Sequence, residues 1–225
     1  MLIVITGTGT GIGKTHFSEA LLLTAGRAGL RAAGVKPIES GVSRSTPSDA
    51  ERLRAASTFH VKPFGYALSD PVSPHLAART DGHTLHIDPI VAAIHGIQTK
   101  LDLLLVELPG GLFTPLAPPA LNVDLAATLR PDRLFLVAPD RLGVLHDVIS
   151  ATRAARAHPL RIDGIVLVTP ESPDLATGRN ASEIPSLTDG LPVVATIPRA
   201  SATSIAATGA LRPCLPQGAR SPHRH

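Results

Sequence analysis

Short apolar runs alternate along this chain with longer stretches in which apolar and polar residues recur at helical spacing. The apolar runs predict strands at residues 2–5, 33–36, 101–107, 133–138, 164–168 and 192–197. The mixed stretches predict helices near residues 14–32, 49–56, 89–100 and 144–157. Strands separated by helices favour an α/β fold: a doubly wound, mostly parallel sheet with helices on both faces.

The pattern is continuous enough for one domain and fades towards the end of the chain. Hydrophobic residues make up 44% of the 225 residues, which is enough to fill a sizeable core. Aromatic residues are only 3%, so the core must be built from Leu, Val, Ile and Ala. After residue 200 the periodicity is lost, and the chain closes with PQGARSPHRH. We therefore expect one domain over residues 1–212 and a flexible tail over 213–225.

Composition narrows the classes of function. The formal net charge of +3 is spread along the chain and makes no case for a nucleic-acid partner. Cys214 is the single cysteine, which excludes an internal disulfide framework and favours a reducing compartment. No apolar run reaches the roughly 18–20 residues of a membrane span, and the apolar start leads into Gly and Thr instead of a cleavage region. The expectation is a cytoplasmic protein without a membrane partner.

A glycine-threonine run, ITGTGTGIGKTH, covers residues 5–16 and joins the first expected strand to the first expected helix. Such a loop presents several backbone N–H groups to one point, and the helix N-terminus adds partial positive charge. An anion is expected there. Lys14 can reach the outer phosphates of a nucleotide, and the hydroxyl of Thr15 is placed to ligate Mg²⁺.

Three further polar residues are expected at the same edge of the sheet. Pro37 ends the second strand and directs Lys36 and Ser40 to the carboxyl edge, where open α/β sheets bind ligands. Asp49 stands in the first turn of the next helix. Glu107 ends the apolar strand LLLV, where a buried carboxylate is costly unless it is paired or holds a cation. Together with Thr15, the two carboxylates make an oxygen-rich site suited to Mg²⁺.

Five motifs, in this order and at these intervals, resemble the dethiobiotin synthetase family of P-loop NTPases over roughly residues 2–200. They are TGTGTGIGKT, VKPIESG, PSDAERL, DPVSPHLAA and VELPGGLFTPL. The resemblance implies a single P-loop NTPase-like ligase domain that depends on ATP and Mg²⁺. Its substrates would be 7,8-diaminononanoate and CO2, and a carbamate and a carbamic-phosphoric anhydride would precede the cyclic urea. The resemblance also implies a homodimer.

The resemblance also assigns roles to individual residues. Lys36 and Lys14 would be the catalytic lysines, Thr15, Asp49 and Glu107 would hold Mg²⁺, and Ser40 would contact the substrate. The substrate carboxylate would meet the helix start at Gly143, Val144 and Leu145. The remaining nucleotide contacts would come from Gly11, Ile12, Gly13 and His16, from Leu108, Pro109 and Gly110, from Val168 and Thr169, and from Ile197, Pro198 and Arg199.

The chain departs from the family pattern at three places. Gly11 stands where an acidic residue is common, and His146-Asp147 stands where Asn-His is usual. Val168 and Thr169 stand where the family often has Asn-Asp to read adenine. Because a valine side chain forms no hydrogen bond, weaker discrimination between nucleotide bases is expected.

Two alternative functions belong to classes of protein that are built on a related sheet. A partitioning-type switch ATPase would carry a signature lysine at position 9, where this chain has Gly9. A P-loop amidoligase acting on a large corrinoid acid would usually bring a glutaminase domain, for which 225 residues leave no room. A switch would hydrolyse ATP slowly without a small substrate, whereas the ligase should depend on the diamine and bicarbonate.

Overall fold

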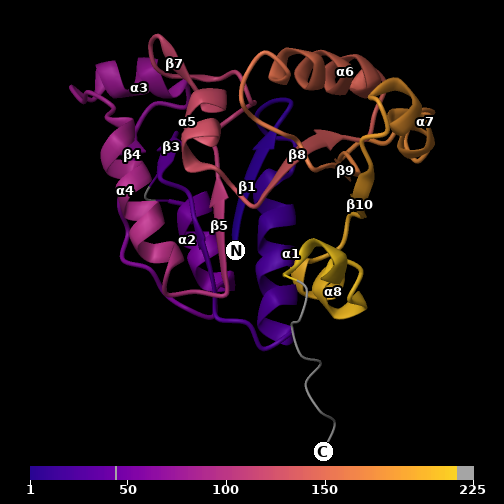
Figure 1. Cartoon of the computed structure of the whole chain (residues 1–225), viewed down its shortest axis with the longest axis horizontal. Coiled ribbons are helices and arrows are strands. Elements are labelled where there is room, and N and C mark those ends of the chain that lie inside the picture. The colour runs from indigo at the N-terminus through magenta and orange to yellow at the C-terminus, as the bar shows by residue number, and fades with distance from the viewer. Residues whose placement is uncertain (44, 217–225) are drawn as a thin grey trace, which may run out of the picture.

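A six-stranded, all-parallel sheet forms the centre of the computed structural model, which describes residues 1–43 and 45–216. The strand order is β10-β9-β8-β1-β5-β2 (Figure 1). These strands are β1 (Leu2–Gly7), β2 (Ala32–Val35), β5 (Leu103–Glu107), β8 (Arg133–Pro139), β9 (Gly164–Val168) and β10 (Val193–Ile197). The predicted parallel α/β sheet is confirmed, and all six expected strands are present.

Helices cover both faces of the sheet. One face carries α1 (Lys14–Arg27), α2 (Asp49–Ala56) and α8 (Ala202–Thr208). The other carries α3 (Pro74–Thr80), α4 (Ile87–Gln98), α5 (Asn122–Leu129), α6 (Val144–Ala155) and α7 (Asn180–Leu187). Figure 1 shows the two layers, with α1 lying along the sheet next to β1.

Strand β1 shows why the apolar runs are short and unbroken. Leu2 and Val4 belong to the hydrophobic cluster under α3–α7, whereas Ile3 and Ile5 belong to the cluster under α1, α2 and α8. Since successive side chains of a strand point to opposite faces, a sheet covered on both sides requires apolar residues at every position. Each such burial stabilises the fold by about 1.5–3 kcal/mol.

The first helix ends earlier than expected, at Arg27 instead of residue 32. Gly29 takes a positive φ of 75°, and Ala32 already belongs to β2. The helical pattern continued through these residues because Leu30 and Ala32 are apolar, but Ala32 is buried as a strand residue.

The hydrophobic pattern did not predict two small sheets of two strands each. β3 (Ile38–Ser40) pairs in parallel with β4 (Tyr66–Leu68), and β6 (Pro115–Ala117) pairs with β7 (Ala120–Leu121). Strands of two or three residues are too short to show a periodicity. At the start of β4, Gly65 has φ 90° and approaches Pro37 so closely that a Cβ would lie 1.9 Å from its carbonyl oxygen.

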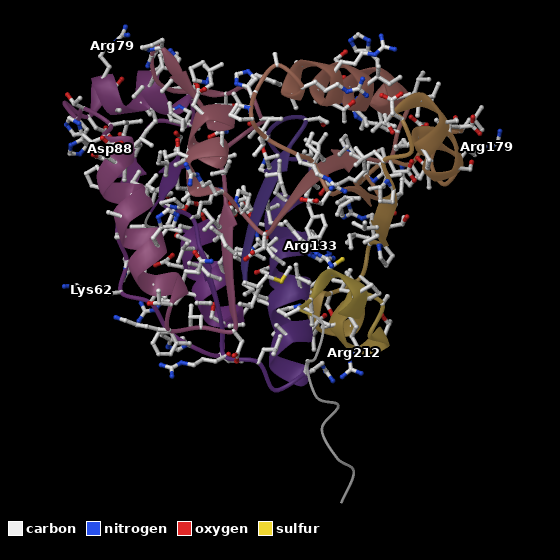
Figure 2. All side chains as sticks on the ribbon, in the orientation of Figure 1. Lys62, Arg79, Asp88, Arg133, Arg179 and Arg212 are labelled. Carbon is white, nitrogen blue, oxygen red and sulfur yellow. The ribbon has the colours of Figure 1, made fainter. Side chains whose placement is uncertain are left out.

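The end of the chain remains packed on the core further than expected. After α8, a 3-10 helix (η1, Arg212–Cys214) brings Cys214 and Leu215 into the cluster beside α1. The guanidinium of Arg133 donates to the carbonyl of Pro213 at 3.0 Å. Figure 2 labels Arg133, close to the α8 region. Residues 213–215, which were expected to begin the tail, thus pack on the core, and residues 217–225 lie outside the described part. Within the described residues, no helix is long and apolar enough to cross a membrane.

Candidate active site

The loop between β1 and α1 has the geometry expected of an anion site. Gly13 precedes α1 with φ 94°, and an added Cβ would lie 2.7 Å from Val168 Cγ1, so no larger residue fits. Among the described residues, no side chain caps the first turn of α1, which leaves its backbone N–H donors available. The Nζ of Lys14 folds back onto the loop and donates to the carbonyl of Gly9 at 2.7 Å.

Glu107 is the centre of a buried cluster at the carboxyl edge of the sheet. Its side chain is fully buried. Oε1 accepts hydrogen bonds from Thr15 Oγ1 at 2.7 Å and from Lys36 Nζ at 3.0 Å, while Oε2 accepts from Ser18 Oγ at 2.8 Å. Lys36 Nζ also pairs with the carboxylate of Asp49.

The fold explains why these residues meet. β5, which ends at Glu107, lies between β1 and β2, so the loop to α1 flanks it on one side and Lys36 follows β2 on the other. Asp49 arrives at the start of α2. The structure thus brings Thr15, Lys36, Asp49 and Glu107 into one hydrogen-bonded cluster beside Lys14.

Lys36 and Asp49 hold each other in the ionised form. Burial alone would lower the pKa of Lys36, but the carboxylates of Glu107 and Asp49 outweigh it and raise that pKa. Burial would raise the pKa of Asp49, but the ammonium of Lys36 lowers it. Among the described residues no carboxylate pairs directly with Lys14, and burial lowers its pKa to about 8. An incoming phosphate would supply the negative charge that Lys14 lacks.

The donor set fits a small, hard cation. Thr15 offers a hydroxyl, and Asp49 and Glu107 offer carboxylates, all of them oxygen ligands. In the part of the chain that the structure describes, no three His, Cys, Asp or Glu side chains converge into a metal cage. Mg²⁺ generally takes one or two carboxylates and completes its shell with water and phosphate oxygens.

A cleft of about 720 Å³ continues from the phosphate loop towards β9 and β10. Of the residues expected to contact a nucleotide, it is lined by Gly11, Ile12, Gly13, His16, Val168, Thr169, Pro198 and Arg199. Ile197 lies beneath it, with its side chain fully buried, and its carbonyl accepts from the Thr169 N–H at 2.9 Å. Leu108 is also fully buried, in the core under α3–α7. Both residues therefore have only their backbone to offer.

Pro109 and Gly110 begin the loop after β5 that packs against the phosphate loop. Pro109 is buried, and Gly110 has φ 61°. Two residues further on, the N–H of Leu112 donates to the carbonyl of Gly7 at 2.9 Å. The two loops are thus joined by a hydrogen bond.

The residues expected to contact the substrate are less tightly connected to the cluster. Ser40 lies in β3, and its buried hydroxyl has no hydrogen-bond partner among the described residues. Gly143 precedes α6 with φ 93°, and the first turn of α6 also lacks a side-chain cap within the described chain. Val144 is buried, whereas Leu145 is partly exposed. No hydrogen bond joins these four residues to Lys36 or Glu107 in the described ranges.

Ser18 is a member of the cluster that sequence reasoning missed. It stands one helical turn after Thr15 on the same face of α1, and that spacing is the signal that indicates it.

Replacing Ser18 by alanine leaves Glu107 Oε2 without its partner, so we expect a loss of about 1–3 kcal/mol in the free energy of unfolding. Urea titration measures it, with exposed Ser186→Ala as the control; an unchanged midpoint for Ser18→Ala would contradict this role.

Comparisons with known proteins identify the family of the chain. Residues 2–206 match the family model AAA_26, described as an AAA domain. The ATP-dependent dethiobiotin synthetase BioD of Anaeromyxobacter dehalogenans (strain 2CP-C) is 38% identical over 197 residues, which cover 85% of this chain and 87% of that protein. The protein of the same name from Ralstonia nicotianae is 39% identical over 168 residues, covering 71% and 72%.

Two solved structures resemble the fold. The septum site-determining protein MinD of Pyrococcus horikoshii, complexed with Mg-ADP, has a TM-score of 0.57 and 18% identity, covering 94% of this chain and 85% of that one. A ParA family ATPase from Chlorobium tepidum has a TM-score of 0.55 and 15% identity, covering 98% and 93%. At such identities the likeness concerns the fold alone.

Proposed function

The chain belongs to the family of ATP-dependent dethiobiotin synthetases, and from this premise we propose that it forms dethiobiotin from 7,8-diaminononanoate, CO2 and ATP. The observation that carries the proposal is the cluster at the carboxyl edge. Two lysine side chains, a hydroxyl and two carboxylates gather there beside a loop whose helix N-terminus is uncapped in the described chain.

The proposed reaction has three balanced steps. The N7 amine attacks CO2 and loses a proton, which gives a carbamate. A carbamate oxygen attacks the γ-phosphorus of ATP, the bond to the β-phosphate oxygen breaks, and ADP leaves. The N8 amine then attacks the carbonyl carbon of the carbamic-phosphoric anhydride, and the C–O bond breaks with release of phosphate. A proton lost from N8 completes the cyclic urea.

The protein's task in the second step is to bring two anions together. Carbamate and γ-phosphate repel each other, and the ammonium groups of Lys14 and Lys36 reduce that repulsion where charge accumulates. Lys36 keeps its proton because two carboxylates raise its pKa. It therefore acts as a fixed positive charge and does not serve as a base. To reach the phosphates, the Nζ of Lys14 would leave the carbonyl of Gly9.

The cation site serves the same step. Thr15, Asp49 and Glu107 would hold Mg²⁺, which supplies charge neutralisation on the transferring phosphoryl group when bound.

Ser40 is proposed to contact the diamine end of the substrate, because its buried hydroxyl has no partner in the described chain. The uncapped start of α6, from Gly143 to Leu145, suits the substrate carboxylate. We also propose a homodimer working in the cytoplasm.

The proposed function is tested by mass spectrometry. Purified protein with Mg-ATP, bicarbonate and 7,8-diaminononanoate should yield dethiobiotin, ADP and phosphate in equal amounts. Omission of the diamine or of bicarbonate should abolish release of phosphate. ATP hydrolysis at the same rate without the diamine would contradict the proposal and favour a switch ATPase.

Nucleotide selection is expected to be weak. Val168 and Thr169 line the cleft beside the phosphate loop, where we propose that the base binds. The side chain of Val168 has no donor or acceptor to offer to a base. Turnover with ATP, CTP and GTP is expected to differ by less than about tenfold, since one discriminating hydrogen bond is worth about that much. A large, exclusive preference for ATP would show that another group reads the base.

A further inference from the structure

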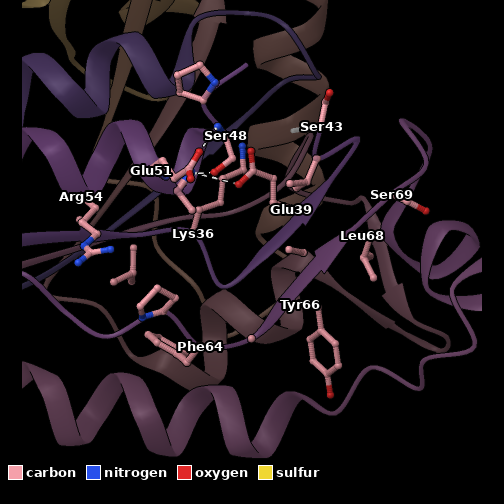
Figure 3. Close-up of a pocket in the computed structure, with 18 of the residues that line it drawn as sticks. Lys36, Glu39, Ser43, Ser48, Glu51, Arg54, Phe64, Tyr66, Leu68 and Ser69 are labelled. Atoms are coloured by element: carbon pink, nitrogen blue, oxygen red, sulfur yellow. Dashed lines mark hydrogen bonds between the residues drawn. The ribbon is translucent and has the colours of Figure 1, made fainter. Parts of the chain in front are cut away.

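Glu39 is a buried carboxylate for which the proposed reaction has no use. It lies in β3, three residues after Lys36, and only 8% of it is exposed. Figure 3 shows it beside Lys36, with Ser48 and Glu51 at the start of the neighbouring helix. Burial raises the pKa of Glu39, which shows that its charge is held here at a cost.

The carboxylate of Glu39 binds the N-terminus of α2. Oε1 accepts from the backbone N–H of Asp49 at 2.6 Å, and Oε2 accepts from the N–H of Ala50 at 3.1 Å. These are the first two residues of the helix, whose N–H groups have no partner within it. Both oxygens of one side chain therefore hold two consecutive backbone groups.

The ordinary capping of α2 is provided by other residues. Ser48 Oγ accepts from the N–H of Glu51 at 3.2 Å, and Glu51 Oε2 accepts from the N–H of Ser48 at 2.8 Å. This reciprocal capping box leaves only the N–H groups of Asp49 and Ala50 for Glu39. The two carboxylates thus bind different backbone groups at the start of α2: Glu51 binds the N–H of Ser48, and Glu39 binds those of Asp49 and Ala50. Asp49 is the residue of this turn that belongs to the cluster around Glu107.

Asp49 takes part both in the capping of α2 and in the cluster around Glu107. Its N–H is fixed by Glu39, and its carboxylate pairs with Lys36. Lys36 and Glu39 lie three residues apart on one short segment, joined by Pro37 and Ile38, both buried. One short segment, residues 36–39, therefore carries Lys36 and, through Glu39, also binds the backbone of Asp49, the ion-pair partner of Lys36.

We propose that Glu39 is a positioning residue, which sets the carboxylate of Asp49 at the cation site by holding the first turn of α2. This inference rests on the proposed function, because it takes Asp49 as a ligand of the nucleotide-bound cation. Without Glu39 the capping box keeps the helix, but the first turn is free to shift, and small misplacements of a reacting group cost up to about 10²-fold in rate.

The test compares Glu39→Ala with Glu51→Ala, since each removes one carboxylate from the start of the same helix. Binding of ADP is measured by calorimetry in EDTA and in Mg²⁺, and turnover is measured against Mg²⁺ concentration. In EDTA, ADP should bind equally to the wild type and to both variants. In Glu39→Ala, the Mg²⁺ concentration for half-maximal activity should rise about 10- to 100-fold, the usual effect of losing a residue that orients a metal ligand.

Two further variants separate a loss of stability from a loss of positioning. Glu51→Ala should lower the melting temperature but leave the Mg²⁺ response unchanged. Glu39→Gln, which keeps one acceptor oxygen, should lie between the wild type and Glu39→Ala, and it also serves if the alanine variant fails to fold. An unchanged Mg²⁺ response in the Glu39 variants would overturn the positioning role alone, whereas a wild type that binds no ADP would overturn the proposed function as well.

Discussion

Replacing Lys36 by alanine is expected to lower the rate of dethiobiotin formation by at least about 10²–10³-fold, the usual effect of losing one preorganised charged contact. Lys36 bridges Asp49 and Glu107, and its side chain is only 8% exposed. Neither a water molecule nor Lys14, which lies against Gly9, can supply the same fixed charge at that point. The measurement is kcat at saturating substrates, with dethiobiotin quantified by mass spectrometry.

Exposed Lys100→Ala is the matched control for Lys36→Ala and should turn over normally. Removal of Lys36 also leaves two carboxylates without their ammonium partner, so the variant should melt earlier in the absence of Mg²⁺. Assays are therefore run well below the melting temperature of the variant. Near-normal turnover would refute the assignment of Lys36 as the catalytic lysine.

Replacing Glu107 by glutamine is expected to lower kcat by at least about 10²-fold. The amide keeps the size of the side chain and one acceptor oxygen, but it removes the negative charge that faces Thr15 and Lys36. A bound cation would then lose one anionic ligand, and the pKa of Lys36 would fall. Steady-state kinetics at increasing Mg²⁺ would show whether the loss is restored by more cation.

Two controls separate this effect from misfolding. Exposed Glu183→Gln should leave kcat unchanged. Binding of ADP to Glu107→Gln in EDTA should match the wild type, because the phosphate loop is unaltered. Full activity of Glu107→Gln would exclude this carboxylate from the cation site.

The sheet and the main cluster could be predicted because both depend on position along the chain. A strand buried on both faces needs consecutive apolar residues, so Leu103–Glu107 and its neighbours stand out in the sequence. The carboxyl ends of parallel strands share one edge, which brings Lys36 and Glu107 together before any contact is known. The order of strands in space, with β5 between β1 and β2, was not available from the sequence.

The contacts that support the cluster could not be predicted, because they depend on elements too short to show a pattern. Glu39, which binds the start of α2, lies in β3, and β3 and its partner β4 have three residues each. Leu108 directly follows Glu107 in the sequence, yet its side chain is buried in the core. Cys214 and Leu215 lie in a stretch without periodicity and are buried by contact with the distant helix α1.

The ion pairs of Lys36 have a practical consequence for handling the protein. Its ammonium group acts as a built-in counter-ion for Glu107 and Asp49. The buried carboxylate of Glu107 and the half-buried carboxylate of Asp49 should therefore need no dissolved metal to be neutralised while the chain folds. Purification in the presence of a chelator is compatible with an intact fold, and the metal and nucleotide are then added together as reagents whose concentrations the experimenter sets.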